Sequence, residues 1–165
     1  MPKKYYTGIG ARKTPEDILD LMTKVARYFH FEKYILRSGG ADGADKAFEL
    51  GAGENKEIFL PWKGFNDSTA PFVELTEEAY KIAEECHPSW NTCKDIVRKF
   101  HTRNVFQILG RDLKTPSDFV ICWTRNGKFI GGTAQSIRIA RKFEVPVFNL
   151  GIEEDKERIL GIFKK

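Results

Sequence analysis

The strongest constraint on the fold is a regular alternation between short apolar segments and segments with helical spacing. The short segments are rich in the aromatic and β-branched residues that favour strands. They are residues 4–9, 34–36, 57–60, 118–123 and 145–148. This alternation predicts an α/β fold, in which a Rossmann-like parallel sheet of about five strands carries helices on both faces.

The segments between these strands have the apolar spacing of amphipathic helices, as at Ile18, Met22 and Val25. Thr14 and Pro15 have the residue types of an N-cap and a first helical position, so a helix is predicted to begin there. Further helices are predicted to start near Asp42, to span 74–86 and 96–109, to open at Gly131 and to close the chain over 153–163. A length of 165 residues suits one domain over residues 1–165.

Composition sets limits on the partners. Lys and Arg total 27 against 23 Asp and Glu, which gives a net charge of +4. This mild excess suits an anionic ligand without requiring nucleic acid. No apolar run approaches the roughly 18 residues of a membrane span, so no membrane partner is expected. Because the first residues also lack the apolar stretch of a secretory signal, we expect a cytoplasmic location.

The residues that hold metals or form disulfides are few. They are Cys86, Cys93, Cys122, His30, His87 and His101. No two cysteines have the CxxC spacing, and the histidines are scattered along the sequence. We therefore expect reduced cysteines and predict no metal site and no cofactor.

Three loops that follow predicted strands are rich in glycine and small polar residues: 8–12, 38–45 and 124–133. Glycine lets a backbone approach a ligand closely, and a helix N-terminus attracts phosphate. A single such loop is better explained by a tight turn, but three at the same edge of a parallel sheet favour a nucleotide-like ligand. Lys13 occupies the third glycine position of the dinucleotide fingerprint, so we predict no ordinary NAD-dependent dehydrogenase.

The predicted ligand-binding residues come from these loops and from the helix over 96–109. They are Gly8, Gly10, Arg12, Ser38, Gly39, Gly40, Asp42, Gly43, Asp45, Arg103, Asn104, Thr124, Gly131, Gly132, Thr133 and Gln135. We expect phosphate on the first two loops and the base or ribose near Thr124, Thr133 and Gln135. Arg12 is either a bidentate clamp for the phosphate or a solvated arginine ahead of the helix. Trp123 is either a stacking partner for a base or a core residue.

Three segments together resemble the SMF/DprA–LOG (SLOG) superfamily: Thr7–Arg12, Arg37–Asp45 and Gly131–Thr133. The Ser-Gly-Gly-Ala segment is closest to the DNA-processing protein A branch. The resemblance covers roughly residues 5–150 and implies a Rossmann-like nucleotide-binding protein. The sequence also resembles the small, DprA-like members of this superfamily that are common in phages. That resemblance implies a location in the host cytoplasm and assembly into a homo-oligomer.

The resemblance leaves several functions open. Members of the LOG branch cleave the N-glycosidic bond of nucleoside monophosphates and carry acidic residues directly after a Gly-Gly-x-Gly-Thr motif. Here Thr133 is followed by Ala134, Gln135 and Ser136, so whether this protein is an enzyme stays open. Asp42 and Asp45 are the remaining candidates for a catalytic carboxylate, although acids at these positions also suit the start of a helix.

The favoured hypothesis is therefore a sensor or sequestering protein for a nucleotide or nucleotide-derived ligand, such as an ADP-ribose-like or cyclic nucleotide signal. One alternative is an N-ribosidic hydrolase of nucleoside monophosphates. The other is a recombination mediator that binds single-stranded DNA, which basic pairs such as Arg98 and Lys99 would serve.

Overall fold

Strands and helices alternate in a computed structural model of the protein, which describes residues 2–164. The strands are β1 (Lys4–Gly8), β2 (Tyr34–Ser38), β3 (Lys56–Ile58), β4 (Val120–Cys122) and β5 (Val147–Asn149). The helices are α1 (Glu16–Phe31), α2 (Ala44–Ala52), α3 (Glu77–Cys86), α4 (Asp95–Leu109), α5 (Gly131–Lys142) and α6 (Glu153–Leu160). Short 3₁₀ turns are η1 (Phe65–Asp67), η2 (Trp90–Thr92), η3 (Arg125–Gly127) and η4 (Gly161–Lys164).

The strands form one sheet in the order β3-β2-β1-β4-β5, and every pairing is parallel. Thr7 in β1 pairs with Arg37 on one side and with Val120 on the other. This confirms the predicted α/β fold. The order also places a switch point between β1 and β4, where ligands of open α/β sheets bind beyond the carboxyl ends of the strands.

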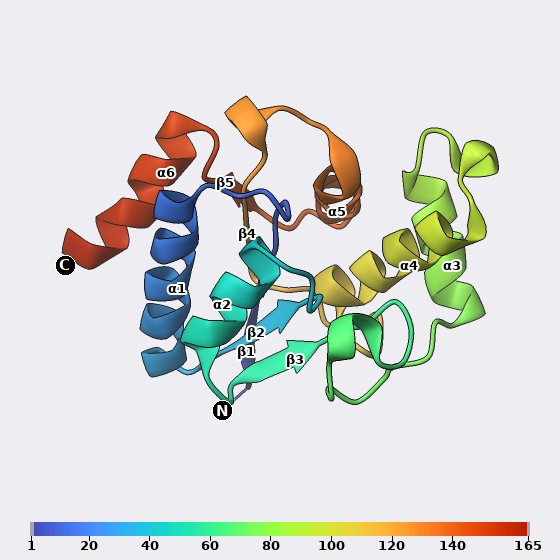
Figure 1. Cartoon of the computed structure of the whole chain (residues 1–165), viewed down its shortest axis with the longest axis horizontal. Coiled ribbons are helices and arrows are strands. Elements are labelled where there is room, and N and C mark those ends of the chain that lie inside the picture. Colours follow the sequence, from blue (N-terminus) through green and yellow to red (C-terminus); the bar gives the residue numbers. More distant parts are fainter. Residues whose placement is uncertain (1, 165) are drawn as a thin grey trace.

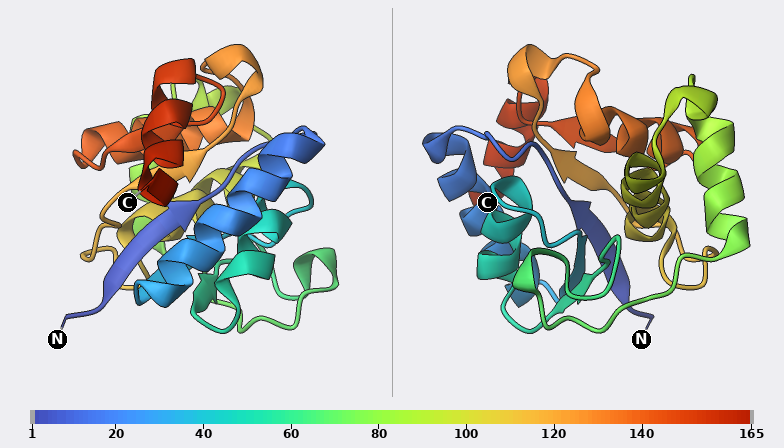
Figure 2. Two further views of the ribbon diagram at one scale, coloured as in Figure 1. Left: turned by 90° about the vertical axis from the view of Figure 1, so that its left-hand side faces the viewer. Right: turned by 45° about the vertical axis from the view of Figure 1, so that its right-hand side comes forward.

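Helices cover both faces of the sheet (Figures 1 and 2). On one face lie α1, α2 and α6, with a core that includes Met22, Phe48 and Ile159. On the other lie α3, α4 and α5, whose core includes Ile108 and Ile139. Because helices cover both faces of the sheet, the strands are rich in apolar residues and do not alternate between apolar and polar ones.

Several element boundaries differ from those predicted. Helix α1 begins at Glu16, and Pro15 takes the N-cap position that was predicted for Thr14. The Thr14 hydroxyl instead donates to the Ala11 carbonyl at 2.6 Å. Helix α3 begins at Glu77, since the Thr76 hydroxyl accepts a hydrogen bond from the Ala79 amide at 3.2 Å. The predicted strand over 118–123 shortens to Val120–Cys122. Among the described residues, no helix combines the length and the apolar character needed to cross a membrane.

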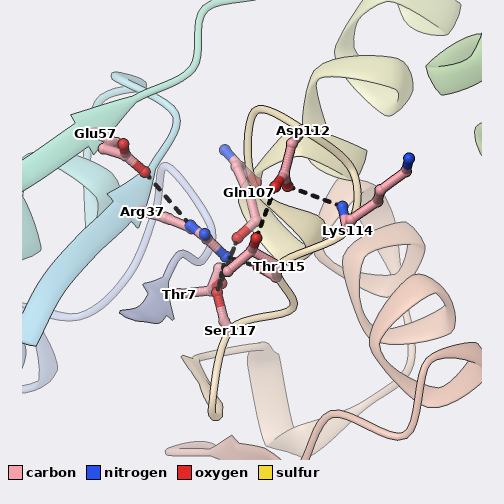
Figure 3. Close-up of polar contacts among 8 residues, drawn as sticks. All are labelled: Thr7, Arg37, Glu57, Gln107, Asp112, Lys114, Thr115 and Ser117. Carbon is pink, nitrogen blue, oxygen red and sulfur yellow. Dashed lines mark hydrogen bonds and ion pairs between the residues drawn. The ribbon is translucent and has the colours of Figure 1, made fainter. Parts of the chain in front are cut away.

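A polar network ties β1 and β2 to the segment between α4 and β4 (Figure 3). Arg37 is buried, and one Nη donates to the Thr115 carbonyl at 2.6 Å and to the Ser117 hydroxyl at 3.1 Å. The Thr7 hydroxyl donates to the Gln107 carbonyl and lies 2.8 Å from the Ser117 hydroxyl. This network fixes the C-terminal end of α4 against the sheet.

Candidate functional site

A cavity of about 660 Å³ lies at the carboxyl edge of the sheet, above the ends of β1 and β4. Its walls come from the loop after β1, the start of α2, one side of α4, the loop after β4 and the start of α5. The lining residues are Ile9, Gly10, Ala11, Arg12, Lys13, Ala41, Asp45, Phe100, Arg103, Asn104, Gln107, Trp123, Thr124, Arg125, Ile130, Gly131, Gly132, Thr133 and Ser136. This cavity therefore lies at the switch point between β1 and β4.

The N-terminus of α5 opens into this cavity. Ile130 stands at the N-cap position and supplies no side-chain hydrogen bond to the first turn. Gly131 and Gly132 are exposed, and both line the cavity with Thr133. The free N–H groups of this turn and the positive end of the helix dipole make the wall attractive to an anion.

The charged side chains of the lining are mostly cationic. Arg12, Lys13, Arg103 and Arg125 line the cavity, whereas Asp45 is its single carboxylate among the described residues. Arg12, Lys13 and Arg125 are exposed at the rim, and Arg103 lies inside. The electrostatic field of the cavity therefore favours a ligand with negative charge.

Arg103 is held in place by the loop after β2. Its side chain is buried, and one Nη donates to the carbonyls of Gly39 at 2.6 Å and Phe59 at 3.1 Å. Its Nε donates to the Asn104 side-chain oxygen at 3.0 Å. Burial lowers the pKa of Arg103 to about 10, so the guanidinium stays charged at neutral pH.

Asp45 lies in the first turn of α2 and is only 4% exposed. The Ala41 amide donates to its carboxylate at 3.2 Å. Burial raises the pKa of Asp45 to about 6, although the charge of Arg103 and the Ala41 hydrogen bond act in the opposite direction. A buried carboxyl group with a raised pKa inside a cavity is typical of functional sites.

The glycines of the Ser-Gly-Gly-Ala segment have a different role from the predicted one. A Cβ at Gly39 would overlap the Arg103 guanidinium and the Gln107 amide, so this glycine makes room for Arg103. Gly43 has φ of +81°, and a Cβ there would overlap the Arg12 carbonyl. The segment thus packs the loop after β2 against α4 and the loop after β1.

The structure brings only part of the predicted set into the cavity. Its members there are Gly10, Arg12, Asp45, Arg103, Asn104, Thr124, Gly131, Gly132 and Thr133. The residues outside the lining are Gly8, Ser38, Gly39, Gly40, Asp42, Gly43 and Gln135. Most of this second group belongs to the loop after β2, so the structure does not place phosphate contacts there as the sequence did.

Two of the residues outside the cavity have clear alternative partners. Gln135 is fully buried, and its Nε2 donates to the Ala83 carbonyl at 3.0 Å, which joins α5 to α3. Its position beside a base or ribose was therefore predicted wrongly. Asp42 is exposed and accepts a hydrogen bond from the Asn66 amide at 3.0 Å, in a smaller hollow beside Arg12.

The predicted set omitted Phe100 and Gln107, which both line the cavity. Together with Arg103 and Asn104 these residues have the spacing i, i+3, i+4 and i+7 of one helix face, and all four line the cavity. This periodicity was the available signal. The spacing is hard to recognise in the sequence, because apolar residues occur around most of α4.

The histidines are also less scattered than the sequence indicated. His87, Cys93 and His101 offer ligand atoms that all lie within 4.8 Å of one another. They lie at the connection between α3 and α4 and line neither hollow described above.

Comparisons with known proteins bear on the fold. No protein-family model matches the sequence, and no curated protein matches it. A solved structure of DNA processing protein A from Helicobacter pylori, described as binding single-stranded DNA, has a TM-score of 0.59 and 20% identity. That match covers 90% of this chain, which spans 65% of the length of the Helicobacter pylori chain.

The Moco carrier protein from Chlamydomonas rheinhardtii is also similar, with a TM-score of 0.55 and 18% identity. The match covers 98% of this chain and 85% of that one. The chain therefore shares a Rossmann-like fold with these two proteins.

Proposed function

We propose that this protein, built on the fold of DNA processing protein A, binds a nucleotide or nucleotide-derived ligand in the cavity at the switch point. The observation that carries the proposal is the uncapped N-terminus of α5, which opens into a cavity lined by four cationic side chains. A volume of about 660 Å³ is within the range of roughly 300–1,000 Å³ that small-molecule sites occupy.

We place the phosphate between the first turn of α5 and the loop after β1. Backbone N–H groups from residues 131–133 would bind it, and Arg12 and Lys13 would neutralise its charge. This revises the sequence hypothesis, because Gly39 in the loop after β2 accepts a hydrogen bond from Arg103 and does not line the cavity.

The remaining lining suits a base and a ribose. Trp123 and Phe100 offer aromatic surface for stacking, and Asn104 and Thr124 offer polar groups for orientation. Because no carboxylate follows Thr133 in α5, binding without turnover is the favoured reading. A protein of this kind would sense or sequester a ligand such as an ADP-ribose-like or cyclic nucleotide signal.

Hydrolysis at an N-ribosidic bond is a second candidate, and Asp45 is the observation that favours it. It is the carboxylate of the lining, and burial brings its pKa to about 6, which suits a general acid or base near neutral pH. Release of free base from nucleoside monophosphates, abolished in Asp45→Asn, would establish this candidate. Intact substrate after prolonged incubation would eliminate it.

A thermal-shift panel tests the binding proposal. It includes nucleoside monophosphates, ADP-ribose, a cyclic dinucleotide and a short single-stranded DNA. A ligand at about one hundred times its Kd adds roughly 2.7 kcal/mol, which corresponds to a rise in Tm of roughly 5–11 °C for a protein of this size. We expect such a rise for one nucleotide class.

The same panel separates the small-ligand proposal from binding of single-stranded DNA. Affinity for DNA falls steeply with salt, because binding releases counterions from many phosphates, whereas a nucleotide in a cavity is less sensitive. A shift with DNA alone that disappears in moderate salt would contradict the small-ligand proposal and favour a DNA-binding function.

A further inference from the structure

We propose that His87, Cys93 and His101 form a binding site for a zinc ion. The three residues lie where α3 connects to α4, on the side of the molecule away from α1 and α6 (Figure 1). His87 ends α3, Cys93 follows the turn η2, and His101 belongs to α4. Two imidazoles and one thiolate are a ligand set that suits zinc.

The distances are close to those that zinc requires. Bond lengths of about 2.0–2.3 Å in a tetrahedral site place neighbouring ligand atoms roughly 3.3–3.8 Å apart. Cys93 Sγ lies 3.7 Å from His87 Nε2, and the rings of His87 and His101 have centroids 4.7 Å apart. All three ligand atoms lie within 4.8 Å of one another, so small side-chain rotations would close the site.

His101 supplies a second, independent observation. Its ring is buried, and Nδ1 has no hydrogen-bond partner among the described residues. Buried polar atoms in folded proteins nearly always have a partner. A bound ion can therefore use this ring without breaking an existing hydrogen bond. His87 and Cys93 are partly exposed, which leaves a path for the ion to enter.

Binding would exchange two existing contacts. The Cys93 thiol donates to the Ser89 carbonyl at 3.6 Å and would lose its proton on binding zinc. The Ser89 amide donates to His87 Nδ1 at 3.0 Å, whereas a ligating imidazole carries a proton on its other nitrogen. Ser89 lies in an exposed turn, so its amide can bind water instead. The loss of the hydrogen bond between Ser89 and His87 therefore costs little free energy.

Three protein ligands leave a fourth coordination position for water.

A zinc ion here would brace the connection between α3 and α4 against the helix that carries Phe100, Arg103 and Asn104 to the cavity. The experiment uses the full chain with Co²⁺ as a spectroscopic substitute and Zn²⁺ by calorimetry. We expect one equivalent to bind, with a thiolate-to-cobalt charge-transfer band, and Zn²⁺ to raise Tm.

Cys93→Ser is the test variant and Cys86→Ser is its matched control, because Cys86 lies nearby but outside the cluster. We expect Cys93→Ser to lose the band and to weaken zinc binding by more than about tenfold, while Cys86→Ser keeps both. His87→Gln, at a second partly exposed position, should weaken binding in the same way. Absence of the band in the wild-type protein, or equal loss in both cysteine variants, would overturn the proposal.

Discussion

Asp45, a buried carboxylate in the cavity that Arg103 also lines, is the unusual feature at the scale of single residues. Burial of a carboxylate is costly, and the neighbouring guanidinium compensates only part of that cost, since the pKa of Asp45 is raised to about 6. A group with a raised pKa binds its proton more tightly in the folded state. Its contribution to stability is therefore present below about pH 4 and is lost as the pH rises through about 6.

This argument predicts that Asp45→Asn stabilises the protein at neutral pH. The expected gain in the free energy of unfolding is roughly 1–3 kcal/mol at pH 7, and it should vanish below about pH 4, where Asp45 is protonated in both states. Denaturant unfolding of both proteins across this pH range measures the difference. A variant that is less stable than the wild type at pH 7 would show that the ionised Asp45 carboxylate is net stabilising.

Gly39 is a second residue with a defined steric role. An added Cβ would overlap the Arg103 guanidinium and the Gln107 amide, so Gly39→Ala should lower stability by about 1–3 kcal/mol. Gly132→Ala is the matched control, because nothing lies within 4 Å of its added Cβ, and it should leave stability unchanged or slightly raised. Equal effects of the two substitutions in thermal unfolding would contradict this assignment.

These residues also show what sequence reasoning can and cannot supply. The glycine pattern predicted correctly that the loop after β2 lies at the sheet edge, because strand ends in parallel sheets share an edge. It could not show that the space freed at Gly39 is filled by Arg103, which follows 64 positions later. Contacts between residues distant in sequence decide whether a glycine faces a ligand or a side chain.

At the scale of elements, the network around Arg37 joins β2 to the connection between α4 and β4. Its guanidinium also lies 3.9 Å from the Tyr5 ring centroid and 3.5 Å from a Glu57 carboxylate oxygen. Replacement by an apolar side chain would leave the Thr115 carbonyl and the Ser117 hydroxyl without this donor.

Arg37→Met should therefore lower the free energy of unfolding by about 2–4 kcal/mol. The matched control is Arg27→Met, at an exposed position of α1, which should change stability by less than about 0.5 kcal/mol. Chemical denaturation of both variants provides the comparison. If Arg37→Met is as stable as the control, the network does not secure the end of α4.

The elements themselves were largely predictable, because strands buried on both faces and amphipathic helices leave clear periodicities. Their ends were less so. Thr14 has the residue type of an N-cap, yet its hydroxyl donates a hydrogen bond to the Ala11 carbonyl in the loop after β1. The polar face of α4 was only partly visible, since its cavity-facing residues alternate with apolar ones that pack against α3 and α5.

At the scale of the whole molecule, the sheet order places the loops after β1 and β4 side by side and positions α5 with its N-terminus at the same edge. Each glycine-rich loop alone was weak evidence for a ligand site in the sequence. The parallel topology brings these loops together at the carboxyl edge of the sheet. The single-domain organisation, the homo-oligomer and the cytoplasmic location stay predictions. The central claim is that an anionic group of a nucleotide binds at the first turn of α5.

The most direct test introduces a carboxylate at that turn. Thr133→Glu should preserve or slightly raise stability, because an acid in the first turn of a helix interacts favourably with the helix dipole by about 0.3–1 kcal/mol. It should repel a phosphate from the cavity. Thr133→Gln has nearly the same size without the charge and is the matched control.

Calorimetric titration of the best nucleotide from the panel into the wild-type protein and both variants is the deciding measurement. The account predicts that Thr133→Glu weakens binding at least about tenfold, a loss of about 1.4 kcal/mol or more, while Thr133→Gln binds within a fewfold of the wild type. Equal affinity of Thr133→Glu and Thr133→Gln would show that the ligand's negative charge lies elsewhere and would contradict the proposed site.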